Sequence, residues 1–436
     1  MQTKPNVIVF FTDQQRWDTL GIHGNPLDLT PNLDSMAAEG THCFNAFTCQ
    51  PVCAPARASL QTGKYATNTG VYKNKIVLGN EQKTLANYFK EAGYNTGYIG
   101  KWHLACGDPV PREEQGSYDY WLGANTLEIT SDTYRTEVFD KDGEKVFLPG
   151  YRTDALTDAA IRYVSKQREN PFFLFMSHLE PHHQNHLDDY PPPTGYRERY
   201  ANRWVPGDLA ALGGSSAFCN EVSRAQHLGG YFGMVKRVDE ALGRLLDALR
   251  SMEILDNTII LFTSDHGNHF KTRNSEYKRS CHEASIRIPM VLKGPRFDGG
   301  GNVTDLVNLV DMPPTLLDAA GIPIPAEMEG RSILDGRKDW PDDIFVQISE
   351  SQVGRAVRTK RWKYGVTAEG LDGCEESSSP EYTEQYLYDL ENDPHEQVNL
   401  CGSISHKEVS LDMRKRLKKY LQKVEKSAPT IIEAVN

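Results

Sequence analysis

Continuous apolar runs recur through the first three hundred residues of the chain. They lie at residues 6–11, 171–177, 258–263 and 288–292, with a further strand-like segment at residues 95–100. Their β-branched and aromatic side chains are typical of strands buried on both faces of a parallel sheet. Amphipathic segments with helical start and stop signals alternate with these runs, at residues 30–39, 84–92, 153–168 and 226–252. This alternation predicts an α/β fold with a large, mainly parallel β-sheet sandwiched by helices.

The pattern changes near residue 340. Short strand-like segments follow one another there, at residues 344–348, 354–359, 362–366 and 385–388. A charged helical segment follows at about residues 406–426, and the acidic, serine-rich residues 372–380 are typical of a solvated loop. We therefore predict two domains: a large N-terminal domain over residues 1–338, and a smaller α+β subdomain with a short antiparallel sheet over residues 339–436.

Charge and hydropathy narrow the classes of partner. The 436 residues carry a formal net charge of −11, which argues against a nucleic-acid partner because no basic surplus exists to neutralise phosphates. No apolar run approaches the roughly 18 residues that a membrane span needs, so we expect no membrane partner. The N-terminal segment lacks a signal-peptide pattern, which predicts a cytoplasmic protein, or a secreted or periplasmic one whose leader has been removed. The oligomeric state is not indicated.

Acidic side chains follow two of the predicted buried strands. Asp13 and Gln14 come directly after the first, and Asp265 and His266 follow the strand at residues 258–263. Ligands bind beyond the carboxyl ends of strands in such sheets, so these residues could converge on one metal. Oxygen ligands with one imidazole suit Ca²⁺, Mg²⁺ or Mn²⁺. Either Asp alone is more often a helix cap or a turn residue; together, after two buried strands, they favour a metal site.

Cationic side chains follow other strands of the same predicted edge. Lys101 and His103 follow residues 95–100, His178 and His182 follow residues 171–177, and Lys278 lies between the Asp265 turn and the next strand. A single His in such a loop is more often structural than catalytic. A cationic pocket within an acidic protein is nevertheless the arrangement expected for an anionic ester such as a sulfate or phosphate.

The cysteines show no disulfide framework, so we expect mostly free thiols. Cys49 and Cys53 form a CxxxC pair, but no second pair completes a four-ligand metal site. Residues 56–61 have helical character, which places Cys53 at or before a helix N-terminus, where backbone N–H groups favour an anion. Arg57, four residues on, can turn back toward the same place. Cys49 lacks this context and is expected to be a packed thiol.

The segment from Cys53 to Gly63, CAPARASLQTG, resembles the C-x-P-x-R signature of the type I sulfatases, members of the alkaline phosphatase superfamily. Further matches follow in the family's order, at residues 30–34, 100–103, 181–182, 264–267, 283–289, 358–363 and 387–394. The resemblance implies an alkaline phosphatase-like fold, with the catalytic domain in residues 1–338. It also implies that a maturation enzyme oxidises Cys53 to formylglycine. One oxygen of the formylglycine hydrate would attack sulfur and displace the alcohol. The second hydroxyl of the hydrate would then lose its proton, so that the aldehyde re-forms and sulfate leaves.

The same resemblance implies a role for each matching residue. Asp13, Gln14, Asp265 and His266, with formylglycine at position 53, would hold the metal, which is usually Ca²⁺. Arg57 would stabilise the deprotonated diol, and Lys101 and Lys278 would bind sulfate oxygens. His103 would assist proton movement at the diol. His182 would contact the substrate and act as general acid at the leaving oxygen.

One position departs from the family pattern. Most sulfatases carry a second acid where this chain has Gln14, so the site loses one negative charge, and Mn²⁺ or Mg²⁺ becomes more credible. The phosphonate monoester hydrolases and related phosphodiesterases tolerate such a Gln, so hydrolysis of those esters is the alternative. If Cys53 stays a thiol, a non-catalytic binder of sulfated sugars is a further alternative.

A sulfated carbohydrate is the substrate that we predict. The candidate sugar contacts lie in the loops after the strands, namely His178, His183, Asn185, Trp204 and Arg273. Each of them singly is more often a surface or packing residue. The sequence does not indicate which sugar, which sulfate position, or whether action is exo or endo.

Overall fold

The computed structural model describes residues 4–167, 169–211, 221–336 and 339–434, with only the backbone described at residues 221–226. The domain boundary that we expect at residue 338 lies outside the described residues, as do Cys219 and the last residue of the helix predicted over residues 153–168. The helices of the described part include none that is both long and apolar enough to cross a membrane.

A ten-stranded sheet forms the centre of the large domain in the described residues. Its spatial order is β10 (Gly301–Asn308), β2 (Thr41–Phe47), β9 (Met290–Lys293), β8 (Thr258–Ser264), β1 (Asn6–Thr12), β7 (Phe172–Ser177), β3 (Asn95–Lys101), β4 (Tyr120–Ala124), β5 (Thr136–Asp140) and β6 (Lys145–Leu148). The strands from β8 to β4 are parallel to one another, whereas β9, β5 and β6 pair antiparallel. The sheet is therefore mixed, with the predicted parallel arrangement at its centre.

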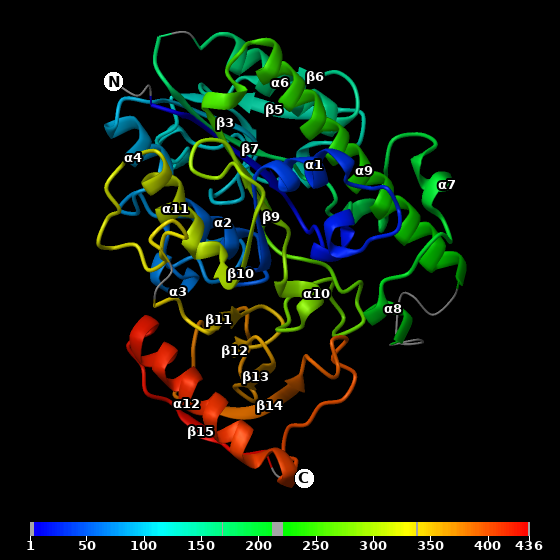
Figure 1. Ribbon diagram of the computed structural model, residues 1–436, viewed down its shortest axis with the longest axis vertical. Coiled ribbons are helices and arrows are strands. Elements are labelled where there is room, and N and C mark those ends of the chain that lie inside the picture. Colours follow the sequence, from blue (N-terminus) through cyan, green and yellow to red (C-terminus); the bar gives the residue numbers. More distant parts are fainter. Residues whose placement is uncertain (1–3, 168, 212–220, 337–338, 435–436) are drawn as a thin grey trace.

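Helices cover both faces of this sheet (Figure 1). Val7 and Val9 of β1 pack into one hydrophobic core, and Ile8 and Phe10 pack into another on the opposite face. The first core includes α2 (Cys53–Thr62), α4 (Leu85–Glu91) and α11 (Met312–Ala319). The second includes α1 (Pro31–Glu39), α6 (Arg152–Ser165) and α9 (Glu221–Ser251). A strand covered on both faces must be apolar at every position, which explains the unbroken runs in the sequence.

Five short helices lie in the loops around this sandwich: α3 (Ala66–Thr69), α5 (Leu127–Thr130), α7 (Tyr196–Tyr200), α8 (Gly207–Ala211) and α10 (Glu283–Ile286). The predicted long helices all exist, with ends within a few residues of the predicted ones.

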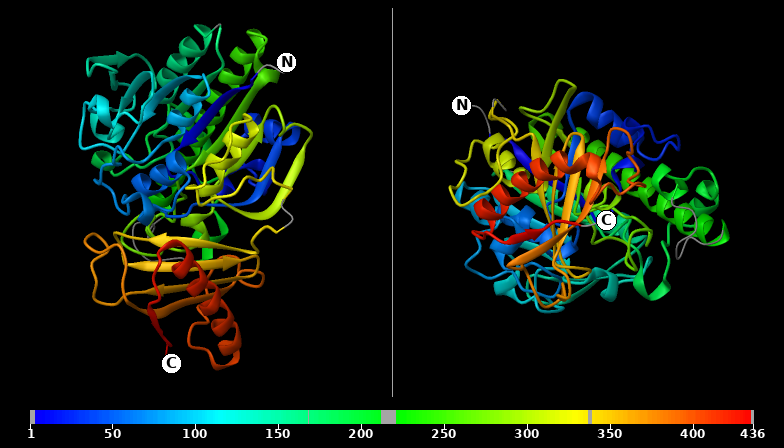
Figure 2. Two further views of the ribbon diagram at one scale, coloured as in Figure 1. Left: turned by 90° about the vertical axis from the view of Figure 1, so that its left-hand side faces the viewer. Right: turned by 90° about the horizontal axis from the view of Figure 1, so that it is seen from below.

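The C-terminal subdomain is a second sheet with one helix, as expected (Figure 2). Its strands are β11 (Asp343–Ile348), β12 (Gly354–Thr359), β13 (Trp362–Thr367), β14 (Glu381–Asp389) and β15 (Thr430–Ile432). The first four are antiparallel, and β15 joins β14 in parallel. The helix α12 (Lys407–Val424) places Met413, Leu417 and Leu421 in the core that also contains Val357 and Tyr364 of the sheet. This sheet lies directly below the large domain in Figure 1.

Strands near the sheet margins were not predicted. β2 and β10 pair with each other at one end of the sheet, and both mix exposed and buried positions, so neither forms an unbroken apolar run. β5 and β6 at the other end are short, and they too mix buried positions with partly exposed ones. The strand expected at residues 288–292 exists as β9, shifted toward the C-terminus and antiparallel to β8.

Candidate active site

The carboxyl ends of β1 and β8 bring two acidic side chains together. The strands are parallel and pair Thr12 with Ser264, so the next residues, Asp13 and Asp265, lie side by side. Both residues are completely buried. Asp265 Oδ1 accepts hydrogen bonds from the backbone N–H groups of Gln14 at 3.0 Å and of His266 at 2.9 Å. The predicted convergence of acids at this edge of the sheet is present.

The first residue of α2, Cys53, faces these acids. Its Sγ lies 3.6 Å from Asp13 Oδ1, 3.3 Å from His266 Nε2 and 2.8 Å from Lys278 Nζ. The helix ends at Gly63, whose left-handed φ of 73° closes it. The motif thus builds a short helix whose N-terminus holds the sulfur in a cationic environment, where an anion is stabilised.

Four side chains are arranged as metal ligands. One ligand atom from each of Asp13, Cys53, Asp265 and His266 lies within 4.8 Å of all the others, and all four residues are buried. Nδ1 of His266 lies 2.9 Å from the Gly267 carbonyl oxygen, to which it donates, so Nε2 keeps its lone pair for a ligand.

Gln14 is beside this cluster in a left-handed backbone conformation, with φ of 65°. Its Oε1 accepts a hydrogen bond from His183 N–H at 3.3 Å, and its buried Nε2 has no partner among the described residues. A non-glycine residue held at positive φ is common where a fold stores strain at a functional site.

Two buried cations neutralise the acids in part. Arg57 Nη2 lies 2.9 Å from Asp13 Oδ2 and 3.5 Å from Asp265 Oδ2. Lys101 Nζ lies 2.9 Å from Asp13 Oδ2 and 3.0 Å from Glu128 Oε1. Burial raises the pKa of Asp13, yet Lys101 and other cations outweigh it and hold the pKa well below the ordinary value. Burial and the Asp13 carboxylate raise the pKa of Asp265.

These residues fit a hard divalent cation. Two carboxylates, an imidazole nitrogen and a neighbouring amide offer mainly oxygen ligands, which Ca²⁺, Mg²⁺ and Mn²⁺ prefer. Burial and the Asp13 carboxylate both raise the pKa of Asp265 and so disfavour its charged form, although Arg57 opposes them. A cation between Asp13 and Asp265 would offset the repulsion between the two carboxylates.

The Cys53 thiol lies in a strongly perturbing environment. Burial on its own raises its pKa, but Lys278, Lys101 and His266 outweigh burial, and the pKa falls well below the ordinary thiol range. Cys49, by contrast, is fully buried, and burial raises its pKa to about 12. The two cysteines thus lie in different environments: cations around Cys53 favour its thiolate, whereas burial of Cys49 favours its neutral thiol.

A cavity of about 120 Å³ opens onto Cys53. Its lining residues are Gln14, Cys53, Asn74, His103, Glu128, His182, His183, Asn185, Glu276, Tyr277, Lys278 and Arg279. His182 donates from Nδ1 to the His183 carbonyl oxygen at 2.6 Å, and its Nε2 lies 3.3 Å from Lys278 Nζ. His103 has a positive φ of 63°, and its buried Nδ1 has no partner among the described residues. The predicted catalytic residues therefore converge on one cavity and its buried wall.

Three predicted substrate contacts, His178, Trp204 and Arg273, lie elsewhere. His178 is completely buried beside Phe10, and burial lowers its pKa to about 3. The Arg273 guanidinium donates to the carbonyl oxygens of His395 and Glu396 at 2.6 and 2.8 Å, and with Trp204 it lines a different cavity. Neither His178 nor Arg273 lines the cavity at Cys53, whereas the predicted contacts His183 and Asn185 do.

Several cavity residues were not predicted, Glu128 and Tyr277 among them. Glu128 follows β4, a strand that the pattern did not reveal, so its place at the sheet edge could not be read from the sequence. Tyr277 lies beside Lys278 and is linked to His183, whose Nε2 is 3.1 Å from the tyrosine hydroxyl. The neighbouring lysine was the signal that could have drawn attention to it.

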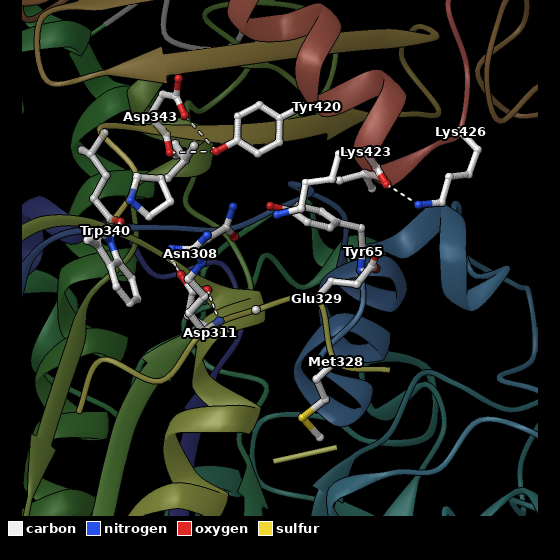
Figure 3. Close-up of a pocket in the computed structure, with 16 residues that line it drawn as sticks. Tyr65, Asn308, Asp311, Met328, Glu329, Trp340, Asp343, Tyr420, Lys423 and Lys426 are labelled. Carbon is white, nitrogen blue, oxygen red and sulfur yellow. Dashed lines mark hydrogen bonds between the residues drawn. The ribbon is translucent and has the colours of Figure 1, made fainter. Parts of the chain in front are cut away.

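A second cavity, of about 360 Å³, lies between the large domain and α12 (Figure 3). Two of its polar side chains are hydrogen-bonded within the chain: Glu329 accepts a hydrogen bond from Tyr65 N–H at 2.7 Å, and Tyr420 donates to Asp343 at 2.9 Å. None of the four clustered ligand residues lines this cavity. We therefore place the chemistry at the Cys53 cavity.

Family models of known proteins match most of this chain. The sulfatase family model matches residues 5–322, and the model of the C-terminal part of N-sulphoglucosamine sulphohydrolase matches residues 275–423. The chain belongs to the sulfatase family. As a sulfatase it is a sulfuric ester hydrolase, and its fold is that of the alkaline phosphatase superfamily.

Known sulfatases resemble it over nearly its whole length. An ulvan-active sulfatase of Formosa agariphila is 32% identical, over 96% of this chain and 81% of its own. An N-acetylglucosamine-6-O-sulfatase of Bacteroides thetaiotaomicron is 25% identical, over 99% of this chain and 89% of its own. The structure of the phosphonate monoester hydrolase of Agrobacterium radiobacter shares the fold, with a TM-score of 0.73 and 21% identity over 96% of each chain.

Proposed function

We propose that this sulfatase removes sulfate from a sulfated carbohydrate through a formylglycine formed from Cys53. The observation that carries the proposal is the position of Cys53 at the start of α2, 2.8 Å from Lys278 Nζ and beside two buried carboxylates. Its Sγ marks the place that the formylglycine oxygens would take. The hydrate of formylglycine would supply an oxygen nucleophile and a route for releasing sulfate.

Three cations would stabilise negative charge at the reacting position, and one of them would contact the sulfate group. Lys278 Nζ points at the reacting position and would contact a sulfate oxygen there. Lys101, completely buried between Asp13 and Glu128, would offset negative charge from behind. Arg57 would hold the Asp13 and Asp265 carboxylates in place through its two ion pairs. Such preorganised charges stabilise the negative charge that develops in the transition state.

His182 suits the role of general acid. Because Nδ1 donates to the His183 carbonyl oxygen, Nε2 is the nitrogen left for the substrate, and in the protonated ring it would carry the proton that is transferred. That atom would protonate the departing sugar oxygen. His103, on the same cavity, would hold or move a proton at position 53.

The metal ligands would be Asp13, Asp265, His266 and the Gln14 amide, with position 53 completing the set. A divalent cation bound there would act as a Lewis acid and neutralise sulfate charge. Ca²⁺ is the first candidate, with Mg²⁺ and Mn²⁺ as alternatives, because the amide replaces a charged ligand.

The cavity supports a carbohydrate as the group that bears the sulfate. Asn74, Asn185 and Tyr277 line it with polar groups that can bond sugar hydroxyls, and Tyr277 adds an aromatic surface. The names of the Formosa and Bacteroides relatives point the same way, since they act on ulvan and on N-acetylglucosamine-6-O-sulfate groups. A maturation enzyme that oxidises Cys53 is the partner that this chemistry requires.

Gln14 favours one alternative. A neutral amide in place of a second acid lowers the negative charge beside the metal, as the family pattern of phosphonate monoester hydrolases allows, and such an enzyme shares the fold. Hydrolysis of a phosphonate monoester or phosphodiester is therefore the second candidate.

A substrate panel tests the proposal. Sulfated monosaccharides and disaccharides should be assayed beside p-nitrophenyl sulfate and a p-nitrophenyl phosphonate, with Cys53→Ala protein as the blank. We expect the highest kcat/KM with one of the sulfated sugars. A higher kcat/KM with the phosphonate would replace the proposal with the alternative.

A further inference from the structure

A glutamate of the C-terminal subdomain lies directly behind the wall of the catalytic cavity. Glu350 follows β11, and its side chain is 9% exposed. It does not line the cavity, but it contacts two residues that do, Asn74 and Arg279. These two residues belong to separate loops, one near the start of α2 in space and the other next to Lys278.

One carboxylate oxygen of Glu350 is bonded to the loop beside the nucleophile. Glu350 Oε1 accepts a hydrogen bond from the backbone N–H of Asn74 at 2.6 Å. The Asn74 side chain in turn accepts one from Ala54 N–H at 3.1 Å. Ala54 is the second residue of α2, so Asn74 satisfies a backbone N–H that the helix itself leaves free, directly beside Cys53. Glu350 is therefore bonded to the residue that caps the helix carrying Cys53.

The other carboxylate oxygen is bonded to the loop that carries Lys278. Glu350 Oε2 lies 2.5 Å from Arg279 Nη2, and the neighbouring Ser351 Oγ donates to the Arg279 carbonyl oxygen at 2.5 Å. Arg279 adopts a positive φ of 69°, a left-handed conformation that is strained for a non-glycine residue and persists only when its surroundings hold it. Lys278, the preceding residue, places its Nζ 2.8 Å from Cys53 Sγ.

We propose that Glu350 is a positioning residue of the sulfatase reaction, which holds the start of α2 and the Lys278 loop in register across the cavity. The inference rests on the proposed function, because it assigns Lys278 to sulfate binding. Glu350 bridges the two walls, with one carboxylate oxygen on Asn74 and the other on Arg279. Loss of one carboxylate charge should change how the site binds sulfate, because Lys278 depends on the conformation of Arg279.

The test compares E350Q with E350A and with a matched control, E425Q. Gln at position 350 keeps an acceptor for Asn74 N–H and removes one of the two carboxylate charges that pair with Arg279, while Glu276 keeps the other. Glu425 is an equally buried glutamate of the same subdomain, 2.5 Å from Arg355, and neither of these residues lines the cavity. The E425Q variant thus loses an equivalent buried ion pair without touching either wall.

The readouts are kcat and KM for p-nitrophenyl sulfate, the inhibition constant of inorganic sulfate, and thermal unfolding. Each rate is divided by the fraction of Cys53 converted to formylglycine, measured by mass spectrometry. We expect kcat/KM to fall about tenfold in E350Q and about a hundredfold in E350A, the scale of a misplaced catalytic group. The inhibition constant of sulfate should rise in E350Q. The E425Q variant should lose stability but keep the wild-type kcat/KM and the wild-type inhibition constant of sulfate.

Equal kcat/KM in E350Q and E425Q would overturn the inference, and so would a lower kcat/KM with unchanged sulfate inhibition, because Lys278 would then not be displaced. If E350A does not fold, the comparison of E350Q with E425Q decides. Failure of the proposed function looks different: the unmutated enzyme would then favour the phosphonate ester, and the same comparison is read with that substrate and with inorganic phosphate as inhibitor.

Discussion

Replacing His182 with alanine removes the proposed general acid. Its proton should matter for substrates whose leaving group is poor and not for those whose leaving group is stable as an anion. The imidazole is anchored by Nδ1 on the His183 carbonyl oxygen, 2.6 Å away, so Nε2 faces the cavity next to Lys278. A sugar alkoxide is a poor leaving group and needs a proton as the ester bond breaks. The p-nitrophenolate ion is stable and leaves without one.

The expected loss follows from this difference. A positioned general acid contributes about 10²- to 10⁴-fold, or about 3–5 kcal/mol of barrier. We expect H182A to lower kcat on a sulfated monosaccharide by that factor. With p-nitrophenyl sulfate we expect a fall of about tenfold or less, because only contacts of the ring are lost. Steady-state kinetics with both substrates measures the ratio directly.

A suitable control is H186A. His186 lies on the same loop, is half-exposed, pairs with Asp132 and does not line the cavity. It should leave both rates unchanged. An equal loss with both substrates in H182A would refute the role of His182 as general acid and would indicate a contribution to sulfate binding instead.

Three further results are expected. K278M should lower kcat by about 10²- to 10³-fold, the usual effect of removing a preorganised charge, and an unchanged kcat would contradict sulfate binding by Lys278. Chelation should abolish activity and lower the melting temperature, because Asp13 and Asp265 then face each other without a metal ion between them. Ca²⁺, Mg²⁺ or Mn²⁺ should restore both, and full activity in protein shown to be metal-free would exclude the site. Burial raises the pKa of Asp239 to about 6. The Asp239 carboxyl group therefore binds its proton more tightly in the native state than in the unfolded state. The stability that this proton contributes is lost as the pH rises from the unfolded-state pKa through about 6. Between about pH 4.5 and 7.5 the wild type should lose about 2 kcal/mol relative to D239N in urea unfolding, and a pH-independent difference would contradict this.

The parts of the fold that could be predicted are those where burial on both faces requires an apolar side chain at every position. The central strands β1, β7 and β8 are apolar throughout because helices cover both of their faces. β2 and β10 could not be recognised, because their partly exposed positions carry polar side chains at irregular intervals. The central strands β1, β3, β7 and β8 and the neighbouring β9 could therefore be predicted, whereas β4 and the strands toward the two ends of the sheet could not.

The same physical difference applies to the site. Asp13, Asp265 and Lys101 could be expected together because they follow, or end, buried parallel strands whose ends share one edge. Arg273 lies on a long loop, and the loop directs its guanidinium to the backbone of residues 395 and 396. Glu350 reaches the cavity wall only through the docking of the second domain, which no local pattern encodes.

The central claim is that Cys53 works as formylglycine. The most direct test is mass spectrometry of the Cys53 peptide from preparations made with and without a formylglycine-generating enzyme, each assayed with the best sulfated sugar. We predict that activity rises in proportion to the converted fraction and that fully unconverted protein is inactive. Full activity with an unmodified Cys53 thiol, or with a Cys49–Cys53 disulfide, would contradict the account.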